Sequence, residues 1–191
     1  MSLCWRLVVV FAIQAAALLY MIADRHWTLV NGTPVILETE PVDPRSLFSG
    51  DYVALRYKIN RLALMELAGE REFRPHEDVY VVLRRGEPYW TPVSAHTTMP
   101  AVPADGAVIR GEVVESQARF WNSTPRSQDG LYLGVRYGIE AYFVPEGEGR
   151  RIERPAPNEK VSIRIAVDPR GHAAIQALLV NGAERYVEGL F

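Results

Sequence analysis

The stretch VSIRIAVD, residues 161–168, carries the clearest structural pattern in the sequence. Its odd-numbered positions hold valine or isoleucine, whereas its even-numbered positions hold serine, arginine, alanine and aspartate. This period of two indicates a β-strand with one buried face, because successive side chains of a strand point to opposite sides. Asn181 and Gly182 follow between two apolar runs, and this dipeptide favours a two-residue type I′ turn. We therefore predict a hairpin near the end of the chain.

The same alternation recurs through most of the sequence. It is found at 51–60, 79–83, 109–113, 131–137 and 142–144. The chain also contains 13 prolines and 14 glycines, spread between these runs, which indicates many turns and short strands. Only 61–71, RLALMELAGER, has apolar residues at helical spacing, and it predicts one short helix. We therefore predict a mainly β fold class, in which the soluble region is rich in antiparallel β-strands.

A long apolar segment precedes this region. Residues 7–23 read LVVVFAIQAAALLYMIA, in which Gln14 is the one polar side chain. A helix over 3–23 would be roughly 31 Å long, about the thickness of the hydrocarbon core of a bilayer. We predict a single transmembrane anchor over 1–27, surrounded by membrane lipid. A signal peptide cleaved near 15–17 and a buried core helix are the alternatives.

Composition excludes several classes of function. The 191 residues include 21 Lys+Arg against 23 Asp+Glu, so a formal net charge of −2 excludes nucleic-acid binding through bulk charge. Cys4 is the single cysteine, which excludes a disulfide framework and a cysteine-based zinc site. The four histidines are scattered without the spacing of metal ligands. We predict no catalytic residues, no metal and no cofactor.

Two six-residue segments resemble each other. YVALRY at 52–57 and YLGVRY at 132–137 share tyrosines at both ends and an arginine before the second tyrosine. We infer two related β units, over 33–115 and 116–191, in which Arg56 and Arg136 would be equivalent. The alternative is chance, since all strands with a period of two look alike.

The first of these segments belongs to the longer run GDYVALRY, residues 50–57. This run is similar to the G-D-Y-x-x-L-x-Y pattern of a bacterial family, the GDYXXLXY proteins, and YGIEAYFVPEGEG at 137–149 also resembles that family. The resemblance implies anchoring in the bacterial inner membrane and supplies no activity. It also implies a multi-pass membrane protein as partner, because such proteins often accompany members of the family. The positive-inside rule, applied to Arg6, favours a cytoplasmic N-terminus and a periplasmic β region.

The candidate binding residues are taken from the two motif regions. They are Gly50, Asp51, Tyr52, Arg56, Tyr57, Arg136, Glu140 and Tyr142. Gly50 and Asp51 have an alternative structural role, as a turn that leads into the strand. Glu140 lies among apolar residues, so we expect a salt bridge from it to Arg136 or Arg56.

The sequence favours a non-catalytic binding role, with an integral membrane protein as partner. Tyrosine and arginine, which are frequent in both motifs, also favour recognition contacts. One alternative is an envelope hydrolase, in which Ser46 or Ser49 would be the nucleophile and Lys58 the general base. Another is a domain that binds a small molecule or glycan between the two β units.

Overall fold

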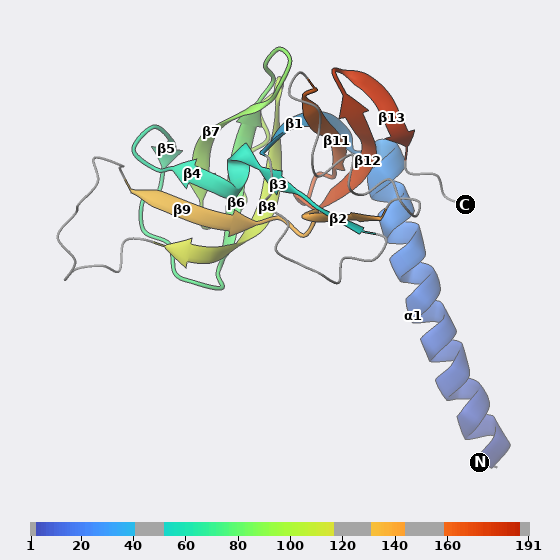
Figure 1. The fold of residues 1–191 in the computed structure, drawn as a ribbon. Helices are drawn as coiled ribbons and strands as arrows, with labels where there is room; N and C mark the ends of the chain where they lie inside the picture. Colours follow the sequence, from blue (N-terminus) through green and yellow to red (C-terminus); the bar gives the residue numbers. More distant parts are fainter. Residues whose placement is uncertain (1–2, 41–51, 117–130, 144–158, 188–191) are drawn as a thin grey trace.

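A computed structural model of the chain describes residues 3–40, 52–116, 131–143 and 159–187. One helix, α1 (Leu3–Asn31), projects from a β domain, and its apolar part is not covered by that domain (Figure 1). The helix is long and apolar enough to cross a membrane, and the alternative of a buried core helix is wrong. It runs four residues beyond residue 27, the end of the predicted anchor.

The described strands form two larger sheets and one small one. The first sheet has the order β13 (Ala183–Val187), β12 (Ala173–Val180), β11 (Val161–Val167), β1 (Thr33–Glu40) and β3 (Arg56–Tyr57). The second has the order β4 (Arg61–Ala63), β9 (Tyr132–Arg136), β8 (Gly106–Ser116), β6 (Asp78–Arg84), β7 (Thr91–His96) and β5 (Ala68–Gly69). The small sheet pairs β10 (Ala141–Phe143) with β2 (Tyr52–Ala54). Apart from the parallel pair β5 and β7, the described pairs are antiparallel, so the mainly β prediction is confirmed.

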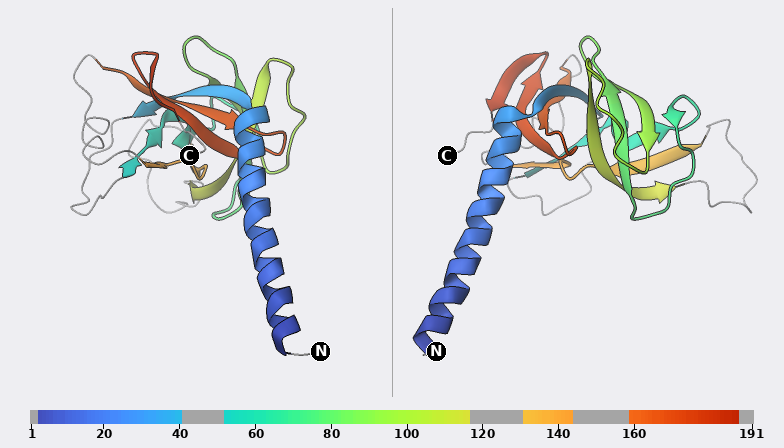
Figure 2. Two further views of the ribbon diagram at one scale, coloured as in Figure 1. Left: turned by 90° about the vertical axis from the view of Figure 1, so that its right-hand side faces the viewer. Right: turned by 180° about the vertical axis from the view of Figure 1, so that it is seen from behind.

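The predicted ranges 33–115 and 116–191 do not form separate sheets. Strand β1 from the first range pairs with β11 from the second, and β9 from the second lies between β8 and β4 from the first. One hydrophobic core accordingly contains residues of both larger sheets, such as Val35, Ile163, Val81 and Ile109. The two larger sheets share this core, and Figure 2 (right) shows the strands of the first sheet next to those of the second.

Two local predictions are wrong. The stretch 61–71 is not a helix: Leu62 pairs with Leu133 across β4 and β9, and Leu62 and Leu64 are both buried. Their spacing of two matches the sheet, and the sheet contacts override the helical preference of the segment. The stretch 51–60 is not one strand either, because β3 is followed by a 3₁₀ turn, η1 (Lys58–Asn60). The predicted alternation of burial nevertheless holds, with Leu55, Tyr57 and Ile59 buried.

Strand β11 is buried on both faces, whereas its sequence predicted one exposed face. Ser162 and Ala166, on the face predicted to be polar, are almost fully buried. The last turns of α1 pack against β11 and β12 and cover this face. The hairpin after β12 is confirmed: Asn181 and Gly182 have φ angles of 52° and 80°, both positive as a type I′ turn requires.

Candidate functional site

The described part of the motif, 52–57, contributes β2 to the small sheet and β3 to the first sheet. Gly50 and Asp51 lie outside the described residues, so the predicted turn stays a prediction. Tyr57 is 1% exposed, and its hydroxyl donates a hydrogen bond to the carbonyl oxygen of Ile139 at 2.6 Å. The tyrosine of the second motif does the converse: Tyr137 is buried, and its hydroxyl donates to the carbonyl oxygen of Ile59 at 2.9 Å. The two hydroxyls therefore join the two motif regions.

Each tyrosine is also held by a polar side chain three residues later. The Asn60 Oδ1 atom accepts a hydrogen bond from the Tyr57 amide at 2.6 Å, and Glu140 Oε1 accepts one from the Tyr137 amide at 2.6 Å. Asn60 Nδ2 donates to Glu140 Oε1 at 3.0 Å and to the carbonyl oxygen of Val135 at 2.8 Å. Four polar groups thus form one connected network between the motifs.

The prediction of a salt bridge from Glu140 to Arg136 or Arg56 is wrong. Arg136 instead pairs with Glu112 on the neighbouring strand β8, at 2.7 Å, and Glu112 also contacts His76 at 2.8 Å. The Arg136 hydrogen bond, followed by that of His76, lowers the pKa of Glu112. Glu140 can do without a cationic partner because backbone and side-chain amides donate to it.

Burial divides the predicted binding residues into two groups. Tyr57 and Tyr142 are buried, and Glu140 is half-buried. Arg56 and Arg136 are exposed, so a partner can reach them directly. The backbone of Tyr52 lies in β2, opposite Phe143.

The two tyrosines do not suit acid–base chemistry. Burial, and to a smaller extent the Glu140 carboxylate, raises the pKa of Tyr57 and of Tyr137 well above the usual value. Both hydroxyls therefore keep their protons at physiological pH and act as hydrogen-bond donors. Their chemistry is structural: they connect the two motif regions across the core.

Lys58 does not fit the general base of a Ser/Lys hydrolase. Its side chain is 58% exposed and its Nζ atom lies 2.7 Å from Glu38 Oε2. The Glu38 hydrogen bond is the main reason why the pKa of Lys58 is raised, whereas a lysine base needs a lowered pKa. The proposed nucleophiles, Ser46 and Ser49, lie outside the described residues.

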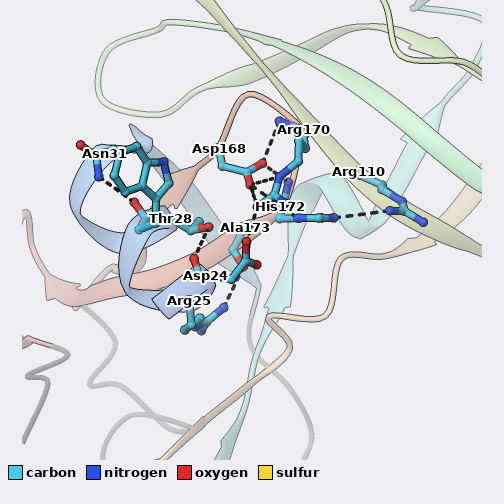
Figure 3. Close-up of polar contacts among 10 residues, drawn as sticks. Asp24, Arg25, Thr28, Asn31, Arg110, Asp168, Arg170, His172 and Ala173 are labelled. Atoms are coloured by element: carbon cyan, nitrogen blue, oxygen red, sulfur yellow. Dashed lines mark hydrogen bonds and ion pairs between the residues drawn. The ribbon is translucent and has the colours of Figure 1, made fainter. Parts of the chain in front are cut away.

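A second polar site lies where α1 meets the first sheet (Figure 3). We call it the anchor junction; it consists of Asp24, Arg25, Leu29, Asp168, Arg170, Ala173 and Gln176. Arg170 Nη2 donates to Asp24 Oδ1 at 2.6 Å, and Arg25 Nη1 donates to the Ala173 carbonyl oxygen at 3.0 Å. Gln176 Nε2 donates to the Leu29 carbonyl oxygen at 2.7 Å. Three contacts therefore fix the last turns of α1 on the turn after β11 and on β12.

Asp168 organises the sheet side of the anchor junction. Its carboxylate accepts hydrogen bonds from the backbone amides of Arg170 and His172, at 2.9 and 2.8 Å, and from Arg170 Nε at 3.0 Å. Burial by itself would raise the pKa of Asp168, but these hydrogen bonds outweigh burial and lower it. Arg170 thus bridges two carboxylates, one on the sheet and one on α1.

The same turn also contacts the second sheet. Gly171, at φ 86°, accepts a hydrogen bond through its carbonyl oxygen from the Arg110 amide of β8 at 2.8 Å. Arg110 in turn pairs with Asp78 of β6 at 2.7 Å. A continuous polar path therefore runs from α1 through the turn at 168–172 to the second sheet. Sequence reasoning missed this site, because its members lie 146 residues apart and only the DPRG turn residues give a local signal.

No group of three or more metal-ligating side chains is found within the described ranges. Among the comparisons with known proteins, a family model described as GDYXXLXY protein matches residues 14–178. The search of curated proteins and the search of solved structures each found no match.

Proposed function

Since this chain is a member of the GDYXXLXY protein family, we propose that it is a single-pass protein of the bacterial inner membrane. Its β domain, on the periplasmic side, binds an integral membrane partner and catalyses no reaction. The observation that carries this proposal is the direct connection between α1 and the β domain. The helix ends at Asn31, strand β1 begins at Thr33, and Gly32 alone lies between them.

This connection fixes the orientation of the domain relative to the helix. The anchor junction holds α1 by its side chains, and Gly32 donates a backbone hydrogen bond to Thr28 at 2.9 Å. A flexible linker in place of Gly32 would leave the orientation of the domain relative to the helix free. A domain that docks on another membrane protein gains affinity from a fixed orientation, because less freedom is lost on binding.

Gln14 supports a partner within the bilayer. Its amide lies midway along the apolar run, exposed on the helix surface, without a hydrogen bond to another described residue. In hydrocarbon an amide without partners is costly, and polar side chains of membrane helices commonly bond to neighbouring helices. A helix of the partner with a polar group at this depth would satisfy it.

Photo-crosslinking in the native membrane tests the proposal. Strand β2, with which β10 pairs, lies in the half of the β domain from which the N-terminal part of α1 projects (Figure 1). A photoreactive amino acid in place of the exposed Ala141 of β10 is expected to crosslink to an integral membrane protein. The same amino acid at Asn181, in the hairpin on the opposite side of the domain, is the matched control.

The connection itself can be tested with a flexible insertion. A Gly-Ser linker between Asn31 and Gly32 is expected to abolish the crosslink from position 141 and to leave the chain in the membrane fraction. The same insertion between Asn181 and Gly182 should leave the crosslink intact. Equal crosslinking in both insertion variants, or no crosslinked membrane protein at all, would contradict the proposal. A Lys58→Ala variant that crosslinks normally but does not restore the phenotype of a deletion strain would favour the hydrolase alternative.

A further inference from the structure

The ladders formed by the two motif regions are related to each other. In the small sheet, Ala54 lies opposite Ala141, and in the second sheet, Gly134 of β9 lies opposite Arg61 of β4. Adding 80 to residues of β2 and subtracting 80 from residues of β10 converts the first ladder into the second. All three residue pairs of β2 and β10 obey this rule.

The hydrogen bonds obey the same rule. The bond from the Tyr57 hydroxyl to Ile139 becomes the bond from the Tyr137 hydroxyl to Ile59. The bond from the Tyr57 amide to the Asn60 side chain becomes the bond from the Tyr137 amide to the Glu140 side chain, with the same length of 2.6 Å. At a two-fold interface the contacts are reciprocal: if residue i of one copy contacts residue j of the other, then residue j of the first copy contacts residue i of the second.

The two larger sheets extend this relation. When β1 is exchanged with β8, β3 with β9, β6 with β11 and β7 with β12, the order β12-β11-β1-β3 of the first sheet becomes β7-β6-β8-β9. That order is found in the second sheet, and each exchanged pair of neighbours is antiparallel in both sheets.

Two local details agree with the exchange. The register between β11 and β12 shifts between Arg164 and Ile165, and the register between β6 and β7 shifts 82 residues earlier, between Val82 and Leu83. Glu40 lies opposite Arg56 across β1 and β3, as Glu112 lies opposite Arg136 across β8 and β9. A common period of two makes strands look alike, but it does not produce the same strand order, the same register shift and the same cross-strand pairs. Chance resemblance therefore does not explain the relation.

We propose that the β domain consists of two copies of one unit, β1 to β7 and β8 to β12, which exchange strands and meet about a local two-fold axis. The family motif forms the interface between the copies, so Tyr57 and Tyr137 are positioning residues within the chain. This places the boundary between β7 and β8, whereas the sequence pattern placed it at 115/116. Strand β8 belongs to the second copy because it takes the place that β1 has in the first.

One departure from symmetry lies on the axis itself. Equivalent positions 60 and 140 hold asparagine and glutamate, and the two side chains contact each other at 3.0 Å. Two carboxylates at this distance would repel each other, whereas an amide donates to a carboxylate. A two-fold relation predicts that the two residues can be exchanged.

The exchange variant Asn60→Glu/Glu140→Asn tests this prediction in the full chain in detergent. Each tyrosine amide should keep an acceptor, so amide hydrogen exchange at Tyr57 and Tyr137 should stay slow. The single variant Asn60→Glu should melt at a lower temperature, and the double variant should regain most of the loss. Fast exchange at either amide, matching that in Asn60→Ala or Glu140→Ala, would overturn the proposal.

The tyrosine hydroxyls provide a second test that does not need the exchange variant to fold. Tyr57→Phe and Tyr137→Phe should each lower the melting temperature by about 2–4 °C, because each removes one buried hydrogen bond of the same interface. Tyr80→Phe is the control, since Tyr80 is half-buried and its hydroxyl has no hydrogen bond to a described residue. An unchanged melting temperature in one of the two motif variants and a lowered one in the other would refute equivalence.

Discussion

At the scale of residues, Asp168 is the acceptor on which the anchor junction depends. Its side chain is 2% exposed, and it accepts hydrogen bonds from two backbone amides and from Arg170. These bonds hold its pKa in the folded protein below its value in the unfolded chain. The stability that it contributes is therefore present above the unfolded pKa and is lost as the pH falls through the folded pKa.

We predict that Asp168→Asn lowers the free energy of unfolding by about 1–3 kcal/mol at pH 7, because charge-assisted hydrogen bonds are replaced by weaker ones. The deficit should shrink toward pH 3, below the usual pKa of an aspartate, because the unfolded chain then takes up a proton that the folded chain binds less readily. Denaturant unfolding of the detergent-solubilised chain at both pH values measures it. Asp78→Asn, which affects an exposed ion pair, is the control and should cost little. A deficit of equal size at both pH values would contradict the role of the carboxylate charge.

The sequence identified the motif residues as candidates, but it did not predict which residues they contact. Repeated tyrosines and arginines identified Tyr57, Arg56 and Arg136, and their alternation correctly predicted that Tyr57 is buried and Arg56 exposed. The contact of Tyr57 with Ile139 spans 82 residues, and no local pattern encodes it. The salt bridge expected for Glu140 failed for the same reason: donors from backbone and from Asn60 become available only in the fold.

At the scale of elements, the joint between α1 and β1 depends on Gly32. A Cβ atom at this position would lie 2.5 Å from the Thr28 carbonyl oxygen and 2.9 Å from Ala166 Cβ. Both distances are shorter than van der Waals contact, and backbone on each side leaves no room for relaxation. The sequence gives no signal for this requirement, because Gly32 looks like an ordinary glycine after a helix.

Gly32→Ala should therefore separate the end of α1 from β11 and destabilise the chain by about 1–3 kcal/mol. Limited proteolysis in detergent is expected to cut the variant between α1 and β1 faster than the native chain. Asn31→Ala is the matched control, since Asn31 is exposed and, among the described residues, its side chain bonds to Trp27 of the same helix. Equal rates of cleavage in Gly32→Ala and the native chain would show that the joint tolerates a side chain.

Elements with a strong period were predicted best. Strands β6, β8, β9 and β11 lie where alternation placed them, and the β12–β13 turn follows from Asn181 and Gly182. The helix predicted at 61–71 failed because helical spacing over so few apolar residues cannot outweigh pairing with β9. The polar face of β11 is buried because α1 covers it, and strand periodicity carries no information about a helix 130 residues earlier.

At the scale of the whole molecule, the sequence indicated repetition but not its form. Similar segments suggest two units side by side, whereas the sheets contain strands from both. One core contains residues of both larger sheets, and a linear sequence does not show how the strands of two similar segments are divided between the sheets. The apolar segment, in contrast, was recognised from length and composition, because both properties are local.

The orientation of the molecule in the membrane gives the last prediction. Arg6 lies free of the β domain near the N-terminal end of α1, whereas Arg25 at the other end donates to Ala173 and is part of the anchor junction. The positive-inside rule, applied to Arg6, favours the cytoplasmic side for this end of the span, so we expect the N-terminus in the cytoplasm and the β domain outside it.

Labelling with a membrane-impermeant maleimide measures this orientation. In spheroplasts, native Cys4, which is exposed and is the only cysteine, should react only after lysis. A Cys4→Ser/Asn181→Cys variant carries its thiol in the exposed hairpin of the β domain and should react before lysis. The reverse order of labelling would place the β domain in the cytoplasm. Every partner that depends on a periplasmic surface would then be excluded, while the anchor junction and the relation between the two copies would be unaffected.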